Sequence, residues 1–289
     1  MAAAALGSGA LGVQSASNEL SACPIVVFSK IYQELKLDFQ EAADLTAEAG
    51  LDGVDCPVRA GGEIEPEQVA EALPRYAKIL GQRNLKVQLI TSGITTVNSP
   101  RAEEVLRTAK NLGVEYYRLG FFERDKKYSA EQQVKEVRSA LKDVAAMSQR
   151  LGIGALFQNH SGSFGSDLND LREVVSGFDP AQIGVAFDIG HAILVHGKDW
   201  VAQFESIKSH LRIAYIKDAR HGESWVRFGE GEIGQSGYFK RLRALGYQAP
   251  FSLHIEFDWS NKGNNRNRDA LLKSLRESRT VLKQWLAES

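Results

Sequence analysis

Hydrophobic and polar positions alternate in blocks along the chain, and the pattern repeats eight times. Each repeat starts with a short, almost continuous apolar run, and a segment with apolar residues at helical spacing follows. Such runs are typical of strands in a parallel sheet that is buried on both faces. The predicted strands span residues 24–30, 51–59, 85–94, 114–122, 153–162, 183–192, 212–220 and 251–257.

The segments between the strands predict helices over residues 39–50, 66–84, 100–113, 130–152, 167–178, 200–211, 237–246 and 267–288. Four of these segments end in glycine, at Gly50, Gly113, Gly152 and Gly246. Glycine adopts the left-handed conformation at low cost, so these positions are expected helix ends.

Eight strand–helix units in 289 residues predict an α/β fold, a single-domain (β/α)₈ barrel of the TIM type over residues 23–289. An open, doubly wound sheet is the alternative. It is disfavoured because no G-x-G-x-x-G motif follows the first strand.

Residues 1–22 precede the barrel and begin with a run of small and apolar residues. This run resembles the end of an export signal, but the basic start is missing because Lys30 is the first basic residue. We expect either the remnant of an export signal or a flexible tail. The first case predicts a periplasmic or exported protein, and the second predicts a cytoplasmic one.

Composition narrows the choice of partners. The chain has 35 Lys and Arg against 36 Asp and Glu, so it has no bulk attraction for nucleic acid. No apolar run reaches the roughly 18–20 residues that span a bilayer, so no membrane partner is expected. Cys23 and Cys56 cannot build a disulfide framework, and Cys56 is expected to be a buried apolar filler. A soluble enzyme or binding protein remains.

Polar residues gather where the predicted strands end, which is where barrels of this kind carry their active sites. Strand periodicity places Gln158 with His160 on one face, and likewise Lys217 with Tyr215. Because buried charge is costly unless it is paired, this convergence predicts a polar pocket. The residues are Ser29, Lys30, Asp55, Arg59, Thr91, Ser92, Arg118, Gln158, Asn159, His160, Asp188, His191, Lys217, Asp218, His254 and Glu256.

Five short motifs lie at these strand ends. They are GLDGVD (50–55), FDIGHA (187–192), IKDA (216–219), GEGEI (229–233) and HIEF (254–257). With this order and spacing, the chain from residue 24 on resembles the xylose isomerase-like barrel superfamily, in its sugar phosphate isomerase/epimerase branch. The resemblance implies a TIM barrel that isomerises or epimerises a sugar.

The resemblance also implies one divalent metal ion, namely Mn, Mg, Co or Zn. Members of the branch commonly hold it with Glu, Asp, His and Glu on strands five to eight, and the matching positions here are Gln158, Asp188, Tyr215 and Glu256. Asp188 and Glu256 match, and Gln158 is the third expected ligand. An amide and a phenol are poor replacements at a Mn or Mg site. Gln158 also breaks the two-glutamate acid–base pair of the branch.

The catalytic candidates are Asp188, Glu256, Lys217, His160 and His191. The two acids could be metal ligands or a general base with its partner, or they could belong to a structural ion-pair network. Lys217 could take the place of the metal ion and stabilise an enolate, or act as a base. Its alternative is a plain ion pair with Glu256. The histidines are candidate acid–base groups near neutral pH, or structural residues.

The candidates for substrate binding are Arg59, Arg118, Gln158, His254, Glu230 and Trp225. The arginines could bind a carboxylate, a phosphate or a polyhydroxyl compound, or form a salt bridge with Asp55. Trp225 and Trp259 could stack on a sugar ring, and Glu230 could reach the substrate from the loop over residues 221–232. Aromatic residues at a barrel mouth are also often plain packing.

The sequence therefore favours an isomerase- or epimerase-like enzyme that acts on a carbohydrate or polyhydroxy carbonyl compound. It would remove a proton next to the carbonyl, in isomerisation, epimerisation or elimination from a 3-keto sugar. A sugar-binding barrel that has lost its metal ligands and catalysis is the alternative. A metal-dependent endonuclease is disfavoured because the chain has only six histidines and no basic charge. The expected partner is a small carbohydrate. Related barrels often form homodimers, and no sequence feature marks an interface.

Overall fold

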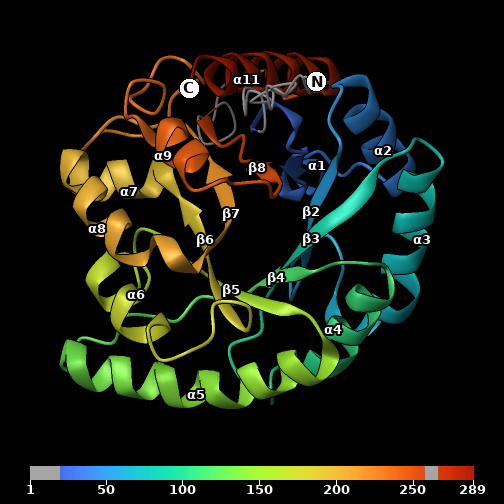
Figure 1. The fold of residues 1–289 in the computed structure, drawn as a ribbon. Coiled ribbons are helices and arrows are strands. Elements are labelled where there is room, and N and C mark those ends of the chain that lie inside the picture. The colour runs from blue at the N-terminus through green and yellow to red at the C-terminus, as the bar shows by residue number, and fades with distance from the viewer. Residues whose placement is uncertain (1–19, 258–265) are drawn as a thin grey trace, which may run out of the picture.

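The computed structural model describes residues 20–257 and 266–289. Eight parallel strands follow one another around a closed barrel, and β8 pairs with β1 (Figure 1). The predicted single-domain (β/α)₈ barrel is confirmed. The strands are β1 (Ile25–Phe28), β2 (Gly53–Val58), β3 (Lys86–Ser92), β4 (Tyr116–Arg118), β5 (Gly154–Gln158), β6 (Ile183–Asp188), β7 (Leu211–Ile216) and β8 (Phe251–Leu253).

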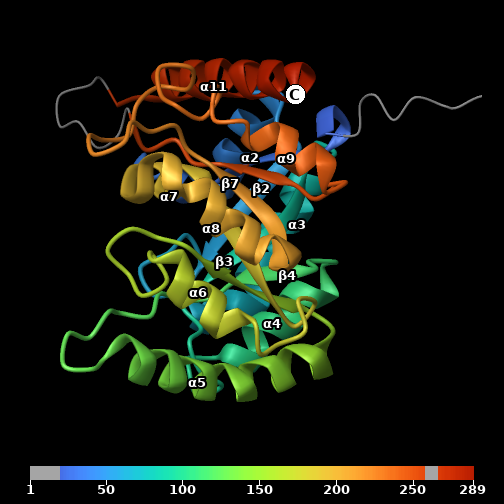
Figure 2. The same cartoon turned by 60° about the vertical axis from the view of Figure 1, so that its left-hand side comes forward.

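Helices surround the barrel on all sides (Figures 1 and 2). The outer helices are α2 (Phe39–Glu48), α3 (Val69–Gly81), α4 (Ala102–Asn111), α5 (Ala130–Leu151), α6 (Leu168–Val175), α8 (Trp200–Ile207), α9 (Tyr238–Ala244) and α11 (Arg268–Glu288). Two short helices, α1 (Lys30–Glu34) and α7 (Ile189–His196), follow β1 and β6 at the barrel mouth. No helix in the described ranges is long and apolar enough to cross a membrane.

Local sequence signals set the ends of several helices. The Asp38 side chain and Glu41 form a capping box at the start of α2, and Ser129 and Gln132 do the same for α5. Such side chains bond amide groups that lack a partner inside the helix. Helix α5 ends at Gly152, which has a φ of 69°, as the sequence predicted.

All eight strands end earlier than the sequence predicted, and the ends of β6 and β8 bear on the site. The sixth was predicted to reach residue 192, but β6 ends at Asp188 and α7 begins there. The reason is that the Asp188 carboxylate accepts the amide of His191 at 3.1 Å and so caps the helix. The eighth strand ends at Leu253, so His254 and Glu256 lie on the segment that follows it. A short apolar run does not separate a buried strand from a buried helix.

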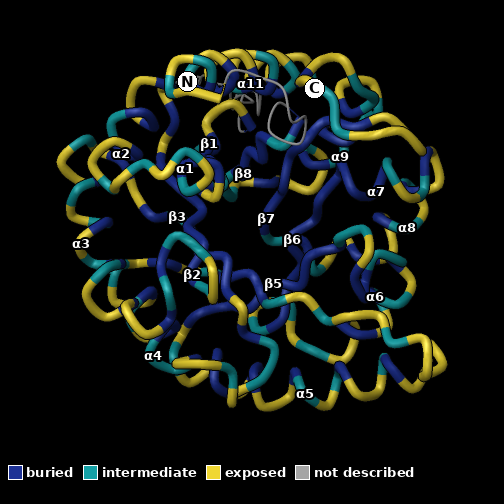
Figure 3. Tube along the Cα trace, turned by 180° about the vertical axis from the view of Figure 1, so that it is seen from behind, coloured by how far each residue is buried: buried dark blue, intermediate teal, exposed yellow. Residues whose placement is uncertain are grey.

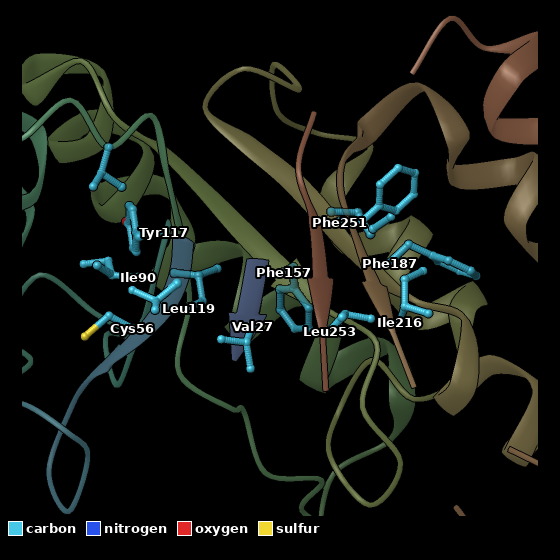
Figure 4. Packing of buried hydrophobic residues seen from close by; sticks show 14 of the residues in the cluster. Val27, Cys56, Ile90, Tyr117, Leu119, Phe157, Phe187, Ile216, Phe251 and Leu253 are labelled. Carbon is cyan, nitrogen blue, oxygen red and sulfur yellow. The ribbon is translucent and has the colours of Figure 1, made fainter. Parts of the chain in front are cut away.

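Apolar residues fill the barrel interior and the layer between sheet and helices, and Figure 3 shows the resulting buried centre. The interior cluster consists of Val26, Leu89, Leu156, Ala186, Ile213 and Tyr215. The larger cluster packs beneath the helices, and Figure 4 shows part of it, including Phe157, Phe187 and Cys56. Cys56 is fully buried there, as expected. The polar residues of the strand ends lie on this rigid base.

Candidate active site

Lys217 is the centre of a buried charge cluster at the C-terminal end of the barrel. It directly follows β7, and its side chain is 2% exposed. Its Nζ atom lies 3.4 Å from Asp188 Oδ2 and 3.2 Å from Glu256 Oε1. The Trp225 ring lies 4.7 Å from the same atom. One ammonium is thus held between two carboxylates, which offsets the cost of burying its charge.

Asp188 is fixed by residues at the end of β5. The Gln158 side chain donates to Asp188 Oδ2 at 3.0 Å. Asn159 donates to the Asp188 carbonyl at 2.9 Å and accepts the Asp188 amide at 2.7 Å. Burial raises the pKa of Asp188 to about 6, and the nearby ammonium of Lys217 opposes this rise. Asp188 is therefore a rigid carboxylate at pH 7. The sequence analysis placed Asn159 in the predicted polar pocket but gave it no catalytic or binding role.

Glu256 is the accessible member of the cluster, because its side chain is 33% exposed. Burial acts to raise its pKa, but the Lys217 ammonium outweighs burial and the net shift is downward. Glu256 is thus a carboxylate at neutral pH that faces open space. That space is a cavity of about 190 Å³ lined by Phe28, Lys30, Ile31, Glu34, Trp225, Ile255 and Glu256.

Two histidines pack beside Lys217. His191 Nε2 lies 3.1 Å from Lys217 Nζ, and the His191 and His160 rings are 4.0 Å apart. The Ser161 amide and hydroxyl lie 3.1 Å and 2.9 Å from His191 Nδ1. Burial and the Lys217 charge lower the pKa of His160 to about 4 and that of His191 well below its usual value. Both rings are therefore neutral at pH 7. The sequence analysis had named them as candidate acid–base groups that titrate near neutral pH, and the lowered pKa values differ from that expectation.

His254 is buried, and neither of its ring nitrogens has a hydrogen-bond partner among the described residues. The ring stacks on Phe28 at 4.7 Å and contacts the tilted ring of Tyr215 at 4.5 Å. Its Nδ1 atom lies 4.0 Å from Glu256 Oε1. Burial lowers its pKa well below the usual value. Buried polar groups nearly always have partners, so these unused nitrogens mark a place where a ligand can bond.

A second polar cluster lies on the side of β2, β3 and β4. Asp55 accepts hydrogen bonds from the Thr91 hydroxyl at 2.9 Å and the Ser252 hydroxyl at 3.1 Å. Burial raises the pKa of Asp55 to about 6. The carboxylate is therefore ionised at pH 7 and is satisfied by hydroxyl groups from two other strands.

Arg118 and Arg59 extend this second cluster. Arg118 is 2% exposed, donates to the Leu119 carbonyl at 2.7 Å and lies 4.3 Å from the centre of the Phe121 ring. Arg59 is half-buried. Across the part of the chain that the structure describes, neither guanidinium forms an ion pair with Asp55 or another carboxylate. The salt bridge that the sequence offered as an alternative is therefore absent there.

Asp218 organises the long loop after β7, although sequence reasoning did not propose a role for it. Its carboxylate accepts four backbone amides at 2.9 to 3.3 Å, those of Ala219, Gly229, Gly231 and Ile233. This loop carries Trp225 over Lys217. Glu230 lies on it too, but it is exposed. Among the described residues, its hydrogen bonds are made by its backbone, which accepts from Arg220 at 3.0 Å and donates to the Arg227 carbonyl at 3.0 Å.

Two glycines in the motifs allow backbone segments to approach the cluster closely. A Cβ atom at Gly190 would lie 2.2 Å from the Lys217 carbonyl oxygen and 2.6 Å from Lys217 Cγ. A Cβ atom at Gly231 would lie 2.2 Å from Asp218 Oδ1. Both distances are far below van der Waals contact. The glycines of FDIGHA and GEGEI are thus explained by the space that Lys217 and Asp218 need.

The residues at the expected metal positions do not fit a metal ion. Lys217 Nζ lies between Asp188 and Glu256, so a divalent ion bound to both acids would touch an ammonium. Gln158 donates to Asp188, and Tyr215 packs in the barrel interior. In residues 20–257 and 266–289, no three His, Cys, Asp or Glu side chains are grouped to hold a metal.

The structure thus brings together ten of the eleven candidates in two neighbouring clusters and leaves Glu230 exposed on the loop. Trp259 and most of the proposed export segment, residues 1–19, lie outside the described residues. A closed eight-stranded barrel with charged groups at its C-terminal strand ends defines a TIM-barrel protein with its site in the usual place.

A family model described as a xylose isomerase-like TIM barrel matches residues 43–284. The chain belongs to this family, which confirms the resemblance drawn from the motifs. An uncharacterised protein of Methanocaldococcus jannaschii is 24% identical over 153 residues, which are 51% of this chain and 47% of that protein. The chain therefore matches about half the length of this curated relative.

Solved structures share the fold at low identity. A xylose isomerase-like TIM barrel protein of Mycobacterium smegmatis in complex with magnesium has a TM-score of 0.68 at 12% identity, over 93% of this chain and 98% of that one. A 3-keto-D-glucoside 4-epimerase of E. coli has a TM-score of 0.63 at 16% sequence identity, and the match covers 84% of this chain and 94% of that one. A probable 3-DHS dehydratase of Bacillus anthracis has a TM-score of 0.66 at 13% sequence identity, and the match covers 90% of this chain and 98% of that one. These likenesses show the fold alone.

Glu63 is a further acid, half-buried, and the sequence analysis did not propose a role for it. Its Oε1 atom is buried without a hydrogen-bond partner, and Oε2 accepts from the Ser29 hydroxyl and the Cys56 thiol. Burial raises the pKa of Glu63 to about 7. An unfolded Glu has a pKa of about 4.3, so the folded state binds more protons between these pH values. Its contribution to stability is complete below about pH 4 and is lost as the pH rises through about 7.

Glu63→Gln is expected to flatten this pH dependence. The free energy of unfolding at pH 8 should rise by about 1–3 kcal/mol relative to wild type, with little change at pH 4.5. The free energy of unfolding is measured by urea denaturation at pH 4.5, 6 and 8. Glu67→Gln, an exposed change nearby, is the matched control and should keep the wild-type slope. Parallel pH profiles for wild type and Glu63→Gln would contradict the assignment.

Asp218→Asn is expected to loosen the loop over residues 219–233. The Asn side chain would turn an NH₂ group toward backbone amides that need an acceptor. Amide hydrogen exchange at Gly229 and Gly231 should then become at least about tenfold faster. Glu223→Gln, on the exposed part of the same loop, is the control. Unchanged exchange in Asp218→Asn would show that the carboxylate does not hold the loop.

Proposed function

We propose that the protein is an enzyme that moves a proton at the carbon next to the carbonyl of a polyhydroxy compound such as a keto sugar. The observation that carries this proposal is the pairing of Glu256 with Lys217 at the wall of a cavity. A carboxylate can remove the proton next to a carbonyl, and an adjacent ammonium can stabilise the enolate oxygen that forms.

Each residue of the cluster has a distinct role in this proposal. Glu256 is ionised and accessible, so it is the general base. Lys217 faces the developing oxyanion, and Asp188 holds it in place. His191 Nε2 is hydrogen-bonded to Lys217 Nζ at 3.1 Å, so His191 helps to orient the Lys217 side chain.

The cluster favours isomerisation or elimination over epimerisation. Epimerisation by two bases needs an acid–base group on each face of the reacting carbon. Gln158 stands where the branch has one of its two glutamates, and its amide is bonded to Asp188. Glu256 and Lys217 lie side by side, at 3.2 Å, and so act from one face. One base with a neighbouring proton donor suits β-elimination from a 3-keto sugar.

The structural neighbours support the substrate class. One is a 3-keto-D-glucoside 4-epimerase and another is a probable dehydratase, so keto-sugar and elimination chemistries both occur on this fold. In the present chain the Lys217 ammonium takes the position of the divalent ion. The alternative, a sugar-binding barrel without catalysis, would use the same pocket and is separated from the enzyme by a test for proton transfer.

Glu256→Gln and Lys217→Met are expected to lower the rate of proton transfer by about 10²–10⁴-fold. The measurement is deuterium uptake from D₂O at the carbon next to the carbonyl of 3-keto-glucosides, followed by NMR. Glu205→Gln and Lys208→Met change an exposed ion pair of the same composition and should keep the wild-type rate. Keto-glucosides that raise the melting temperature of the wild type without any deuterium uptake would instead establish the non-catalytic barrel.

Removal of divalent ions is expected to leave the reaction and the stability unchanged. Lys217 already supplies the positive charge between the two acids, so EDTA has no structural cation to remove. Proton-transfer rates and thermal melts before and after EDTA dialysis, with elemental analysis of the protein, check this. A rate that falls about tenfold or more and returns with Mn or Mg would show a metal enzyme and overturn the role given to Lys217.

A further inference from the structure

The charges at the barrel mouth separate into two halves. On the side of β6, β7 and β8, the ammonium of Lys217 lies between the carboxylates of Asp188 and Glu256. Lys30 and Glu34 line the same cavity and form an ion pair with each other, so the charges of these five described residues sum to one negative charge. On the side of β2, β3 and β4, the guanidiniums of Arg118 and Arg59 face the carboxylate of Asp55. Two positive groups and one negative group leave one formal positive charge there.

Arg118 is the group whose burial most needs an explanation. It is 2% exposed, yet its one hydrogen bond in the described residues goes to the neutral Leu119 carbonyl. A guanidinium has five N–H donors, so most of them are left for another partner. Burial, and with it the charge of Arg59, lowers the pKa of Arg118 to about 10, so it stays a cation at pH 7. A buried cation normally lies against an anion.

Asp55 does not supply that anion. Its two oxygens are already bonded to the Thr91 and Ser252 hydroxyls, and neither arginine forms an ion pair with it. The Phe121 ring covers part of the Arg118 guanidinium but carries no charge to neutralise it. The positive half therefore has two cations and one carboxylate, and within the described chain neither cation forms an ion pair.

His254 connects the two halves. The charges of both Lys217 and Arg118 act on its ring, so it lies within reach of both clusters. Its two nitrogens are unused and its ring is held by Phe28 and Tyr215. A ligand that extends from Lys217 to Arg118 passes this imidazole and can bond to it with a hydroxyl group.

We propose that the substrate carries an anionic group, a carboxylate or a phosphate, which binds Arg118 and Arg59 while its carbonyl lies at Lys217. The position of the carbonyl at Lys217 rests on the proposed function, whereas the binding of the anionic group by Arg118 and Arg59 does not. Guanidiniums bind planar carboxylates and phosphates through paired, charge-assisted hydrogen bonds. The reverse orientation would place the anion against Glu256 and Asp188. The substrate class is thus an acidic or phosphorylated keto sugar, and the charge separation fixes its direction in the barrel.

Three polyol probes of similar length test the anion subsite without any turnover. They are D-gluconate, which carries a carboxylate, D-glucitol 6-phosphate, which carries a phosphate, and neutral D-glucitol. Titration calorimetry should show at least one anionic probe binding about tenfold or more tighter than D-glucitol. Preference for gluconate identifies a sugar acid, and preference for the phosphate identifies a sugar phosphate. Equal binding of all three would overturn the proposal.

Arg118→Gln should abolish the preference for the anionic probe and leave the affinity for D-glucitol within about twofold. Arg172→Gln removes the same charge from exposed helix α6 and should keep the preference. If Arg118→Gln does not fold, half-buried Arg59→Gln provides the second test, with a loss of about threefold or more in anion affinity. Anion binding that survives both substitutions would place it elsewhere and overturn the proposal.

The same titrations in Lys217→Met separate this inference from the proposed function. The anion preference should persist there, because Arg118 and Arg59 are intact. If no keto sugar is turned over by the wild type but the preference is present and lost in Arg118→Gln, the anion subsite stands and the proposed reaction falls. If turnover occurs on neutral keto sugars as fast as on their acidic and phosphorylated forms, the anion subsite falls and the reaction stands.

Discussion

The Lys217 ammonium held between Asp188 and Glu256 is the interaction on which the rest of the site depends. Moving an ammonium out of water is costly, and two carboxylates at 3.4 and 3.2 Å offset that cost. The cluster therefore fixes its surroundings. Asp188 also caps α7, Gln158 is bonded to the same carboxylate, and Gly190 leaves the space that the Lys217 side chain fills. Removing the Lys217 ammonium would take from both carboxylates the cation that they share.

The barrel positions the site by placing polar and charged side chains above an apolar interior layer. Apolar side chains such as Leu156 and Ile213 fill the interior beneath the mouth. Above them, hydroxyl groups of neighbouring strands satisfy Asp55, and the charges lie at the strand ends. The strands are parallel around a closed ring, so side chains from distant parts of the sequence meet at their C-terminal ends. The apolar base excludes water and strengthens the electrostatic interactions above it.

The fold and most of the site were predictable, because both follow from strand periodicity. Alternation along β7 correctly placed Lys217 and Tyr215 toward the interior, and the motif order gave the family. The roles of Asp218 and Asn159 were not predictable, because they bind backbone groups whose positions only the folded loops define. The neutrality of His160 and His191 depends on burial, which periodicity does not measure. The end of β6 was missed because a side-chain cap, rather than an apolar pattern, sets it.

The four amides bonded to Asp218 also affect how a ligand reaches the site from solvent. Lifting the loop over residues 219–233 would strand a carboxylate and four amide groups at once, so Trp225 forms a fixed roof over Lys217. Among the described residues, the cavity between Trp225 and α1 gives a ligand access to Glu256, and Phe28 and Ile31 form its opposite wall. If Trp225 stays fixed, this cavity of about 190 Å³ sets the size of the group that reaches Glu256, which is a constraint that loop motion does not relax.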